Sequence, residues 1–321
     1  MGYIRRPSYY KDFRCIASDC TENCCIGWEI DVDEDTLAYY KSIGSDFSRR
    51  LCAAIAPADE QAGENAHFIL DERERCPFLN DKNLCEVYLN LGEEHMAQIC
   101  TDHPRYYEWF AGGREDGVGL CCEAAAELIL RRRDRPEWDV TGEADEEPDE
   151  FEQALFAMRD RLFAIIKPET PVSFDEKLDR LHLACCEMQN EYDDLLFPVE
   201  GDAEYADEED EPFRWSAMFW SEACLKALTE RLMSLEINKD DWRGLLADVH
   251  ARIPELLARR ADFLAAYADR LYEYDELLEY FVYRHFMKAL GDDVLIEKVQ
   301  FALICTCFIQ LLGIYRWLTD G

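Results

Sequence analysis

The sequence has little positive charge, no apolar leader and only one long apolar run, and each of these shortages excludes a class of protein. Lys and Arg number 34 against 69 Asp and Glu, which gives a net charge of −35. A chain this acidic repels phosphate, so we expect no binding to nucleic acid or to an anionic membrane. The charge suits a basic partner such as a lysine-bearing surface, or it simply keeps the protein soluble.

The N-terminal stretch MGYIRRPSYYKDFRC shows no targeting signal. It lacks the apolar core of a signal peptide, and Arg6 stands where a myristoylation site needs Ser or Thr. The longest apolar run, residues 301–318, contains Gln310 and Arg316 and follows a charged helical pattern. This run predicts a buried helix rather than a membrane span, and we expect a cytoplasmic protein.

Hydrophobic periodicity predicts a mainly α fold in a chain long enough for two or three lobes. We expect a small irregular cysteine-rich metal-binding lobe with a few short strands over 1–135. An acidic linker over 136–150 and a helical body over 151–321 are expected to follow. Within that body, the acidic run near 200–212 predicts an exposed loop.

Short motifs predict individual elements. The alternation in WEIDVD (28–33) predicts a strand with Trp28, Ile30 and Val32 on one side. The glycines and charges of AGGREDGVGL (111–120) predict a hairpin turn rather than a nucleotide-binding loop. Helices are expected over residues 33–43, 93–100, 151–166 and 177–197, and further helices are expected to begin near residues 213, 240 and 254. The last of these has a core-facing stripe at Leu264, Tyr267, Leu271, Tyr274, Leu278 and Phe281.

The fifteen cysteines are too many for an ordinary cytoplasmic protein, where disulfides are rare and clustered thiols more often bind metal. Five of them lie in apolar helical patterns and are expected to be small core residues: Cys185, Cys186, Cys224, Cys305 and Cys307. The other ten precede residue 123. The closest spacing is Cys15-x4-Cys20-x3-Cys24-Cys25.

Thiolate is a soft ligand that selects zinc or iron–sulfur centres. Structural zinc sites usually hold the ion between two CxxC or CxxH turns, and this sequence has no CxxC. Cysteines tens of residues apart better suit an iron–sulfur cluster, in which each iron takes one thiolate. Zinc, disulfides and free thiols remain alternatives on spacing alone. The radical-enzyme motif CxxxCxxC is excluded, because it would need a cysteine at Gly27.

Four stretches carry a resemblance to a known family, the flagellin lysine N-methylases, within a broader group of zinc- or iron-chelating cysteine-cluster proteins. The stretches are CTENCCIGWEIDVD, CPFLNDKNLCEVYLNLGEE, ICTDHPR and LCCEAAAELIL, and YDELLEYFVYRHFMKAL resembles the tyrosine-rich C-terminal segment of that family. The resemblance covers most of 7–318. It implies a 4Fe–4S cluster, S-adenosylmethionine as methyl donor, and lysines of flagellin or another lysine-bearing protein as acceptors.

The resemblance also implies the metal ligands, which are Cys15, Cys20, Cys24, Cys25, Cys76, Cys85, Cys100 and Cys122. Cys122 is preferred to Cys121 because the family reads Ser-Cys-Pro-Glu-Ala-Ala at this point. Glu123 stands here in place of that proline, so the turn after the ligand is expected to differ. Cys52 and Cys121 have no counterpart in the family pattern.

Other residues near the cysteines have simpler expected roles. Trp28, Phe78 and Leu79 are expected to shield a metal from water, and His103 to lie near it without ligating it. Asp31 and Asp33 are expected on a solvated strand face. The alternative interpretation is that they contact a substrate lysine.

Two functions therefore follow from the sequence. The first is an S-adenosylmethionine-dependent protein-lysine N-methyltransferase that depends on a 4Fe–4S cluster. The alternative is a non-enzymatic metal-binding or adaptor protein whose cysteine cluster is structural.

Overall fold

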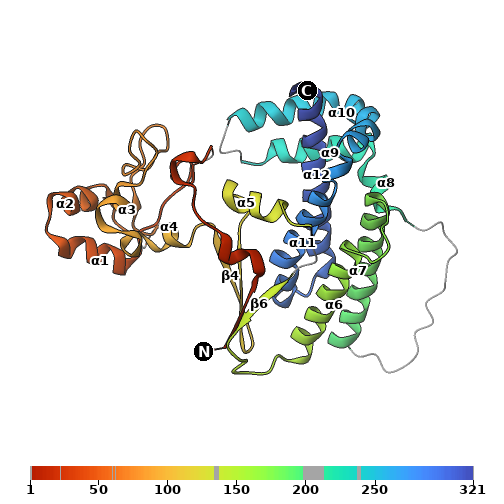
Figure 1. The fold of residues 1–321 in the computed structure, drawn as a ribbon, viewed down its shortest axis with the longest axis horizontal. Coiled ribbons are helices and arrows are strands. Elements are labelled where there is room, and N and C mark those ends of the chain that lie inside the picture. Colours follow the sequence, from red (N-terminus) through yellow and green to blue (C-terminus); the bar gives the residue numbers. More distant parts are fainter. Residues whose placement is uncertain are drawn as a thin grey trace. The chain divides into compact units, whose positions relative to one another are not determined.

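The computed structural model describes residues 2–21, 23–59, 61, 63–133, 137–197, 213–236 and 240–320. Helices dominate this part of the chain, which confirms the prediction of a mainly α protein (Figure 1). The acidic run predicted as a loop near 200–212 lies outside the described residues.

The helices are α1 (Glu34–Ile43), α2 (Asp46–Ala53), α3 (Glu86–Leu91), α4 (Gln98–Asp102), α5 (Glu123–Leu130), α6 (Glu150–Ile166), α7 (Phe174–Leu196), α8 (Trp215–Phe219), α9 (Glu222–Ser234), α10 (Asp240–Ala266), α11 (Tyr272–His285) and α12 (Leu295–Asp320). Short 3-10 turns are η1 (Ser8–Asp12), η2 (Ala17–Asp19), η3 (Glu93–His95), η4 (Ala268–Arg270) and η5 (Phe286–Gly291). The strands are β1 (Tyr3–Pro7), β2 (Ile55–Ala56), β3 (His67–Phe68), β4 (Arg105–Phe110), β5 (Gly113–Val118) and β6 (Trp138–Thr141).

The strands form two small sheets. One has the order β4-β5-β1-β6, and the other pairs β2 with β3 in antiparallel register, Ile55 opposite Phe68. The predicted hairpin is confirmed, because two residues, Ala111 and Gly112, join β4 to the neighbouring β5. Gly112 has a φ of 74°, a backbone conformation that glycine adopts without strain.

The predicted strand at 28–33 is wrong, although its burial pattern is right. Ile30 and Val32 are buried, but the segment forms only an isolated bridge between Asp31 and His67. The extended run is short because Gly27 has a φ of 86° before it and Asp33 caps α1 after it.

Local capping explains where several helices begin. An Asp or Ser precedes the first turn and accepts a hydrogen bond from the backbone N–H three residues later, which satisfies a donor that the helix leaves unpaired. The capping residues are Asp33 for α1, Ser45 for α2, Asp149 for α6, Ser173 for α7 and Ser221 for α9.

The chain divides into two compact units. Unit 1 consists of Met1–Ile4, Trp109–Arg114 and Ile129–Gly321, and unit 2 of Arg5–Glu108 and Glu115–Leu128. All ten of the cysteines that precede residue 123 belong to unit 2. The predicted boundaries at 135 and 150 stay predictions, and the expected acidic linker contributes strand β6.

Unit 1 is built around α12, which lies against α7, α10 and α11 (Figure 1). Its buried face includes Leu303, Cys307, Leu311 and Ile314, which agrees with the expected buried helix. By length and composition α12 could also cross a membrane, and half of its most apolar stretch is buried within the protein.

Two predicted helix limits in unit 1 are wrong. Helix α10 does not begin at Pro254 but runs through it from Asp240, with Ile253 and Leu256 buried on either side. The expected stripe from Leu264 to Phe281 is interrupted by η4. Burial of apolar residues on both sides of Pro254 offsets the hydrogen bond that the proline cannot make.

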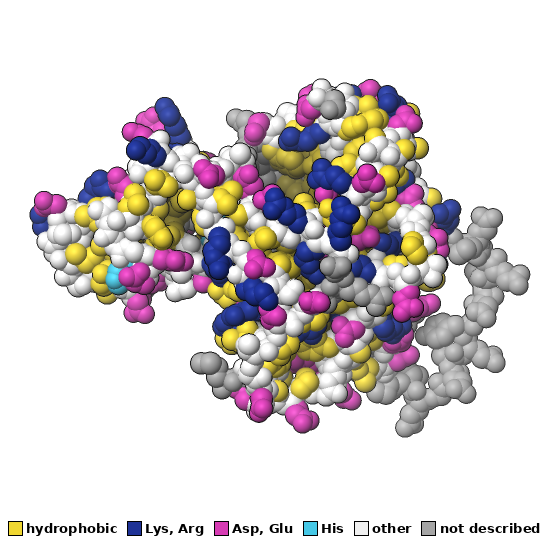
Figure 2. All heavy atoms as spheres, viewed as in Figure 1, with side chains coloured by type: hydrophobic (Ala, Val, Ile, Leu, Met, Phe, Trp, Pro, Cys, Tyr) yellow, Lys and Arg dark blue, Asp and Glu magenta, His cyan; other side chains and the backbone are white. Residues whose placement is uncertain are grey.

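The surface carries both charge signs despite the large net negative charge. Figure 2 shows Asp and Glu side chains scattered over the visible face and interspersed with Lys and Arg. Exposed pairs such as Arg161–Glu191 join neighbouring helices but contribute little to stability.

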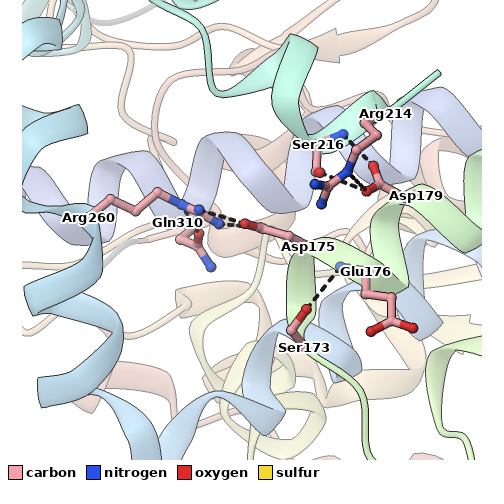
Figure 3. Close-up of polar contacts among 8 residues, drawn as sticks. All are labelled: Ser173, Asp175, Glu176, Asp179, Arg214, Ser216, Arg260 and Gln310. Carbon is pink, nitrogen blue, oxygen red and sulfur yellow. Dashed lines mark hydrogen bonds and ion pairs between the residues drawn. The ribbon is translucent and has the colours of Figure 1, made fainter. Parts of the chain in front are cut away.

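The first turns of α7 carry carboxylates that join it to its neighbours in unit 1 (Figure 3). Asp175 accepts two hydrogen bonds from Arg260 of α10, whose Nε donates to Gln310 of α12 at 3.2 Å. Asp179 accepts hydrogen bonds from the backbone and hydroxyl of Ser216 at 2.7 and 3.0 Å, which fixes the start of α8.

Candidate metal centre

All fifteen cysteines are free thiols. In unit 1, Cys185 and Cys307 are buried, which confirms their expected place in the core, and the other three helical cysteines are half-buried. The remaining ten thiols, in unit 2, include every sequence-predicted ligand.

Backbone hydrogen bonds join three cysteine segments of unit 2. The N–H of Cys76 donates to the carbonyl of Cys25 at 2.8 Å, and a bridge pairs Ile26 with Arg75 beside it. A second bridge pairs Leu79 with Cys85. Residues 25, 76 and 85 are therefore held near one another by the main chain itself.

The other two segments arrive on short helices. Cys100 lies in α4, and Cys122 immediately precedes α5. Each helix is fastened to an earlier segment by one carboxylate. Asp33 accepts a hydrogen bond from the N–H of Gln98 at 2.9 Å, and Glu123 accepts from the N–H and hydroxyl of Thr21 at 2.7 and 2.8 Å.

The thiols from these segments lie within electrostatic reach of one another. Burial raises the pKa of Cys100 to about 12, and the thiols of Cys85, Cys76 and Cys24 add to the increase. Burial likewise raises the pKa of Cys76 to about 11 and also raises that of Cys85, each with a further contribution from another of these thiols. Four separate stretches of chain thus bring sulfur atoms together.

The adjacent pair behaves unequally. A hydrogen bond from the Cys25 thiol lowers the pKa of Cys24 to about 7, whereas that same bond and burial raise the pKa of Cys25. Cys24 is exposed and Cys25 is half-buried against the apolar core of unit 2. The two neighbouring thiols therefore differ in exposure and in acidity.

Backbone N–H groups point at three of the sulfur atoms. Those of Phe78 and Leu79 bond to Cys76, those of Val87 and Tyr88 to Cys85, and those of Ala124 and Ala125 to Cys122. Burial dominates and raises the pKa of all three thiols, but these bonds act against it. Donors of this kind stabilise a thiolate and tune a metal bound to it.

The two N-terminal predicted ligands, Cys15 and Cys20, are more exposed than Cys76. Cys15 is exposed, and its sulfur accepts a hydrogen bond from the N–H of Ala17 at 3.4 Å. Cys20 is half-buried and follows the turn η2. Cys15 and Cys24 both contribute to the raised pKa of Cys122, after burial, so these three thiols form a second, looser neighbourhood.

Apolar residues line the inner side of the thiols. Phe78 and Leu79 are buried in the same core as Cys76, as expected for residues that exclude water. Trp28 is half-buried, donates its ring N–H to the carbonyl of Cys24, and lies 5.8 Å from the ring of His103. Burial lowers the pKa of His103, which favours its neutral form.

Sequence reasoning missed the roles of two residues around the thiols. Asp33 was expected on a solvated strand face, but it caps α1 and reaches Gln98. Tyr40 is fully buried and donates to the carbonyl of His95 at 2.8 Å, and burial together with Cys100 and Cys85 raises its pKa. The Asp-x-x-Thr capping pattern at 33–36 was the available signal for Asp33.

Among the residues that the structure describes, no three His, Cys, Asp or Glu side chains are grouped tightly enough to hold a single metal ion.

Comparison with known proteins gives a partial relationship. The chain is 24% identical over 135 residues, 41% of its length, to "Flagellar biosynthetic protein FliU" of Salmonella muenchen, of which the match covers 79%. It is likewise 24% identical over 135 residues to "Lysine-N-methylase" of Salmonella choleraesuis and of Salmonella typhimurium. The chain spans about a third of the length of these two methylases, 33% in each case.

The similarity to these proteins covers 41% of the chain, which is less than the expected 7–318. No family model matches the sequence, and no solved structure matches it.

Proposed function

We propose that Cys24, Cys76, Cys85 and Cys100 of unit 2 hold a 4Fe–4S cluster. The observation that carries this proposal is that main-chain bonds and bridges hold the segments of Cys24–Cys25, Cys76 and Cys85 together. In agreement with this, burial and the thiols of Cys85, Cys76 and Cys24 raise the pKa of Cys100. Each iron of a cluster takes one thiolate, so the four sulfurs stand farther apart than around one zinc ion. When bound, such a cluster supplies one-electron chemistry and a firm cross-link between segments.

The residues of this chain fit that group in two further ways. The N–H donors aimed at Cys76 and Cys85 compensate negative charge on the ligand sulfurs, and Phe78 and Leu79 keep water from the inner side. Cys15, Cys20, Cys25 and Cys122 are the remaining predicted ligands and stand outside this proposed set.

We infer that the protein acts as a protein-lysine N-methyltransferase on flagellin or another lysine-bearing protein, with S-adenosylmethionine as donor. The named relatives support this activity class. In the reaction, the lone pair of the lysine nitrogen forms a bond to the methyl carbon while the carbon–sulfur bond breaks. The lysine must first lose a proton, since its ordinary pKa is about 10.4. The acidic protein, at −35, attracts a basic acceptor segment.

A non-enzymatic role is the second candidate, because the chain spans only 33% of each methylase. In that case unit 2 binds metal for stability and the protein serves as an adaptor. Calorimetric titration with S-adenosylmethionine separates the two, since only the enzyme binds the donor. Absence of donor binding to a protein with intact cluster favours the adaptor.

The cluster is tested by colour and composition. Protein purified without oxygen is expected to be brown, with broad absorption at about 400 nm and about four irons and four sulfides per chain. Cys76→Ser, Cys85→Ser and Cys100→Ser are each expected to lose most of this absorption. Zinc without iron in the parent protein would contradict the cluster.

Two cysteines of unit 2 outside the proposed set provide matched controls. Cys52 contacts the apolar core and Cys121 is exposed next to Cys122. Cys52→Ser and Cys121→Ser are expected to keep the colour, because neither thiol is a proposed ligand. If these controls bleach as strongly as Cys100→Ser, the assignment of ligands is wrong.

A further inference from the structure

Two carboxylates link the helices that bring Cys100 and Cys122 to distant parts of the chain. A backbone bond from the N–H of Gly119 to the carbonyl of Pro104 also joins the segments of these two thiols, at 2.7 Å. The segments with Cys25, Cys76 and Cys85 are joined by main-chain bonds and bridges. Helices α4 and α5, which bring Cys100 and Cys122, have a different kind of attachment. In α4, the N–H of Gln98 donates to Asp33, 65 residues away, and in α5 the carboxylate of Glu123 accepts from Thr21, 102 residues away.

The Asp33 contact acts on the turn that carries Cys100. One carboxylate oxygen accepts the N–H of Gln98 at 2.9 Å, and both oxygens also bond Thr36 at the start of α1. Gln98 lies two residues before Cys100 in the same short helix, so its position sets that of the thiol. Partial burial would raise the pKa of Asp33, but the bonds from Gln98 and Thr36 lower it, and the group is anionic.

The Glu123 contact acts on the loop that carries Cys20, Cys24 and Cys25. A single oxygen of Glu123 accepts both the N–H and the hydroxyl of Thr21. Glu123 directly follows Cys122, so the bond sets the separation between that thiol and the loop. Because the pair is exposed, it adds little to overall stability and its main effect is geometric.

We propose that Asp33 and Glu123 are positioning residues, which place Cys100 and Cys122 beside Cys24 before any metal arrives. The proposal rests on the proposed cluster for its consequence but not for its geometry. Neither carboxylate is a ligand. Their loss lets α4 and α5 move, which speeds the release of iron without changing the ligand set.

The first experiment measures release of the cluster. A chelator is added, and the absorption of the cluster at about 400 nm is recorded over time. Asp33→Ala and Glu123→Ala are expected to bleach about tenfold faster than the parent, by analogy with the effect of other outer-shell partners. Glu123→Gln is expected to bleach at nearly the parent rate, because its amide oxygen still accepts both bonds from Thr21.

Two controls separate positioning from general loss of stability. Ser45→Ala removes the cap of α2 in the same unit, and α2 carries Cys52 but none of the predicted ligands. Glu127→Ala removes an exposed carboxylate from α5, four residues after Glu123. Both are expected to bleach like the parent. If Ser45→Ala and Asp33→Ala bleach at equal rates, the role of Asp33 is overturned. If Glu123→Ala bleaches at the rate of the parent, the role of Glu123 is overturned.

The second experiment works without metal. Metal-free protein is treated with a short bis-thiol cross-linker and the linked peptides are identified by mass spectrometry. The parent is expected to link Cys24 with Cys100 and with Cys122. Asp33→Ala is expected to lose the first link several-fold and Glu123→Ala the second. If the parent is colourless but each variant still loses its expected link, the proposed cluster is refuted and the positioning role is not. If the variants form the same links as the parent, the positioning role is refuted.

Discussion

In this protein, the surroundings of a titratable residue change its pKa strongly, even between residues of the same type. Two adjacent cysteines, Cys24 and Cys25, have pKa values shifted in opposite directions by one hydrogen bond between them. In unit 1, Glu276 is almost fully buried between Lys167 and Arg132. Burial raises the pKa of Glu276 to about 7 despite these cations.

Glu276 gives unit 1 a predicted dependence on pH. The unfolded carboxyl titrates at its ordinary pKa of 4.5 and the folded one at about 7. Between these values the folded chain retains a proton that the unfolded chain has lost. The free energy of unfolding therefore falls as the pH rises through this window, by about 3 kcal/mol at most.

Glu276→Gln is expected to remove that fall, because the amide does not titrate. Urea unfolding at a series of pH values from 4.5 to 7 measures it. Glu187→Gln, which removes an exposed carboxylate from α7, serves as the control and should keep the slope of the parent. The idea is refuted by a Glu276→Gln protein whose stability still falls as steeply as that of the parent.

At the scale of elements, short helices are placed by side chains from longer ones. Helix α8 has only five residues, too few for a helix that is stable by itself. Its first turn is fixed by Asp179 of α7, and its Trp215 and Phe219 are buried. In unit 2, Asp33 at the start of α1 likewise holds α4, whereas Glu123 of α5 bonds Thr21 of a loop.

Asp179→Ala is expected to destabilise unit 1 by about 1–3 kcal/mol, because it leaves buried donors of Ser216 without an acceptor. Glu176→Ala is the matched control on the same helix (Figure 3). It removes only an exposed pair with Arg180, which is worth about 0–1 kcal/mol. Chemical denaturation compares the two variants. Equal losses would mean that Asp179 does not anchor α8.

At the scale of the whole molecule, charge is the dominant feature. A net charge of −35 on 321 residues destabilises the compact state by self-repulsion. Salt shortens the range of this repulsion, from about 30 Å at 0.01 M to about 8 Å at 0.15 M.

We therefore expect the midpoint of thermal unfolding to rise when sodium chloride is increased over this range. Differential scanning calorimetry at constant pH measures the rise, and potassium chloride at equal ionic strength should reproduce it. A midpoint that falls with salt would show that attractive ion pairs outweigh the repulsion.

The chain alone was sufficient to predict the features that depend on local periodicity. The buried faces of α6 and α7 follow from apolar residues three and four apart, such as Leu155 and Met158 or Leu178 and Leu181. The hairpin at Ala111–Gly112 follows from its glycines, and the buried character of α12 from its apolar run. These features were accessible because neighbouring residues decide them.

Tertiary contacts decided the rest. Only packing carried α10 through Pro254, and only long-range bonds turned the expected strand at 28–33 into an isolated bridge. Separate turns of the chain bring together the thiols of Cys24, Cys76, Cys85 and Cys100. Asp33 and Glu123 bond partners that lie 65 or more residues away in the sequence. Spacing along a sequence does not encode such distances, because loops of many lengths close at nearly the same entropic cost.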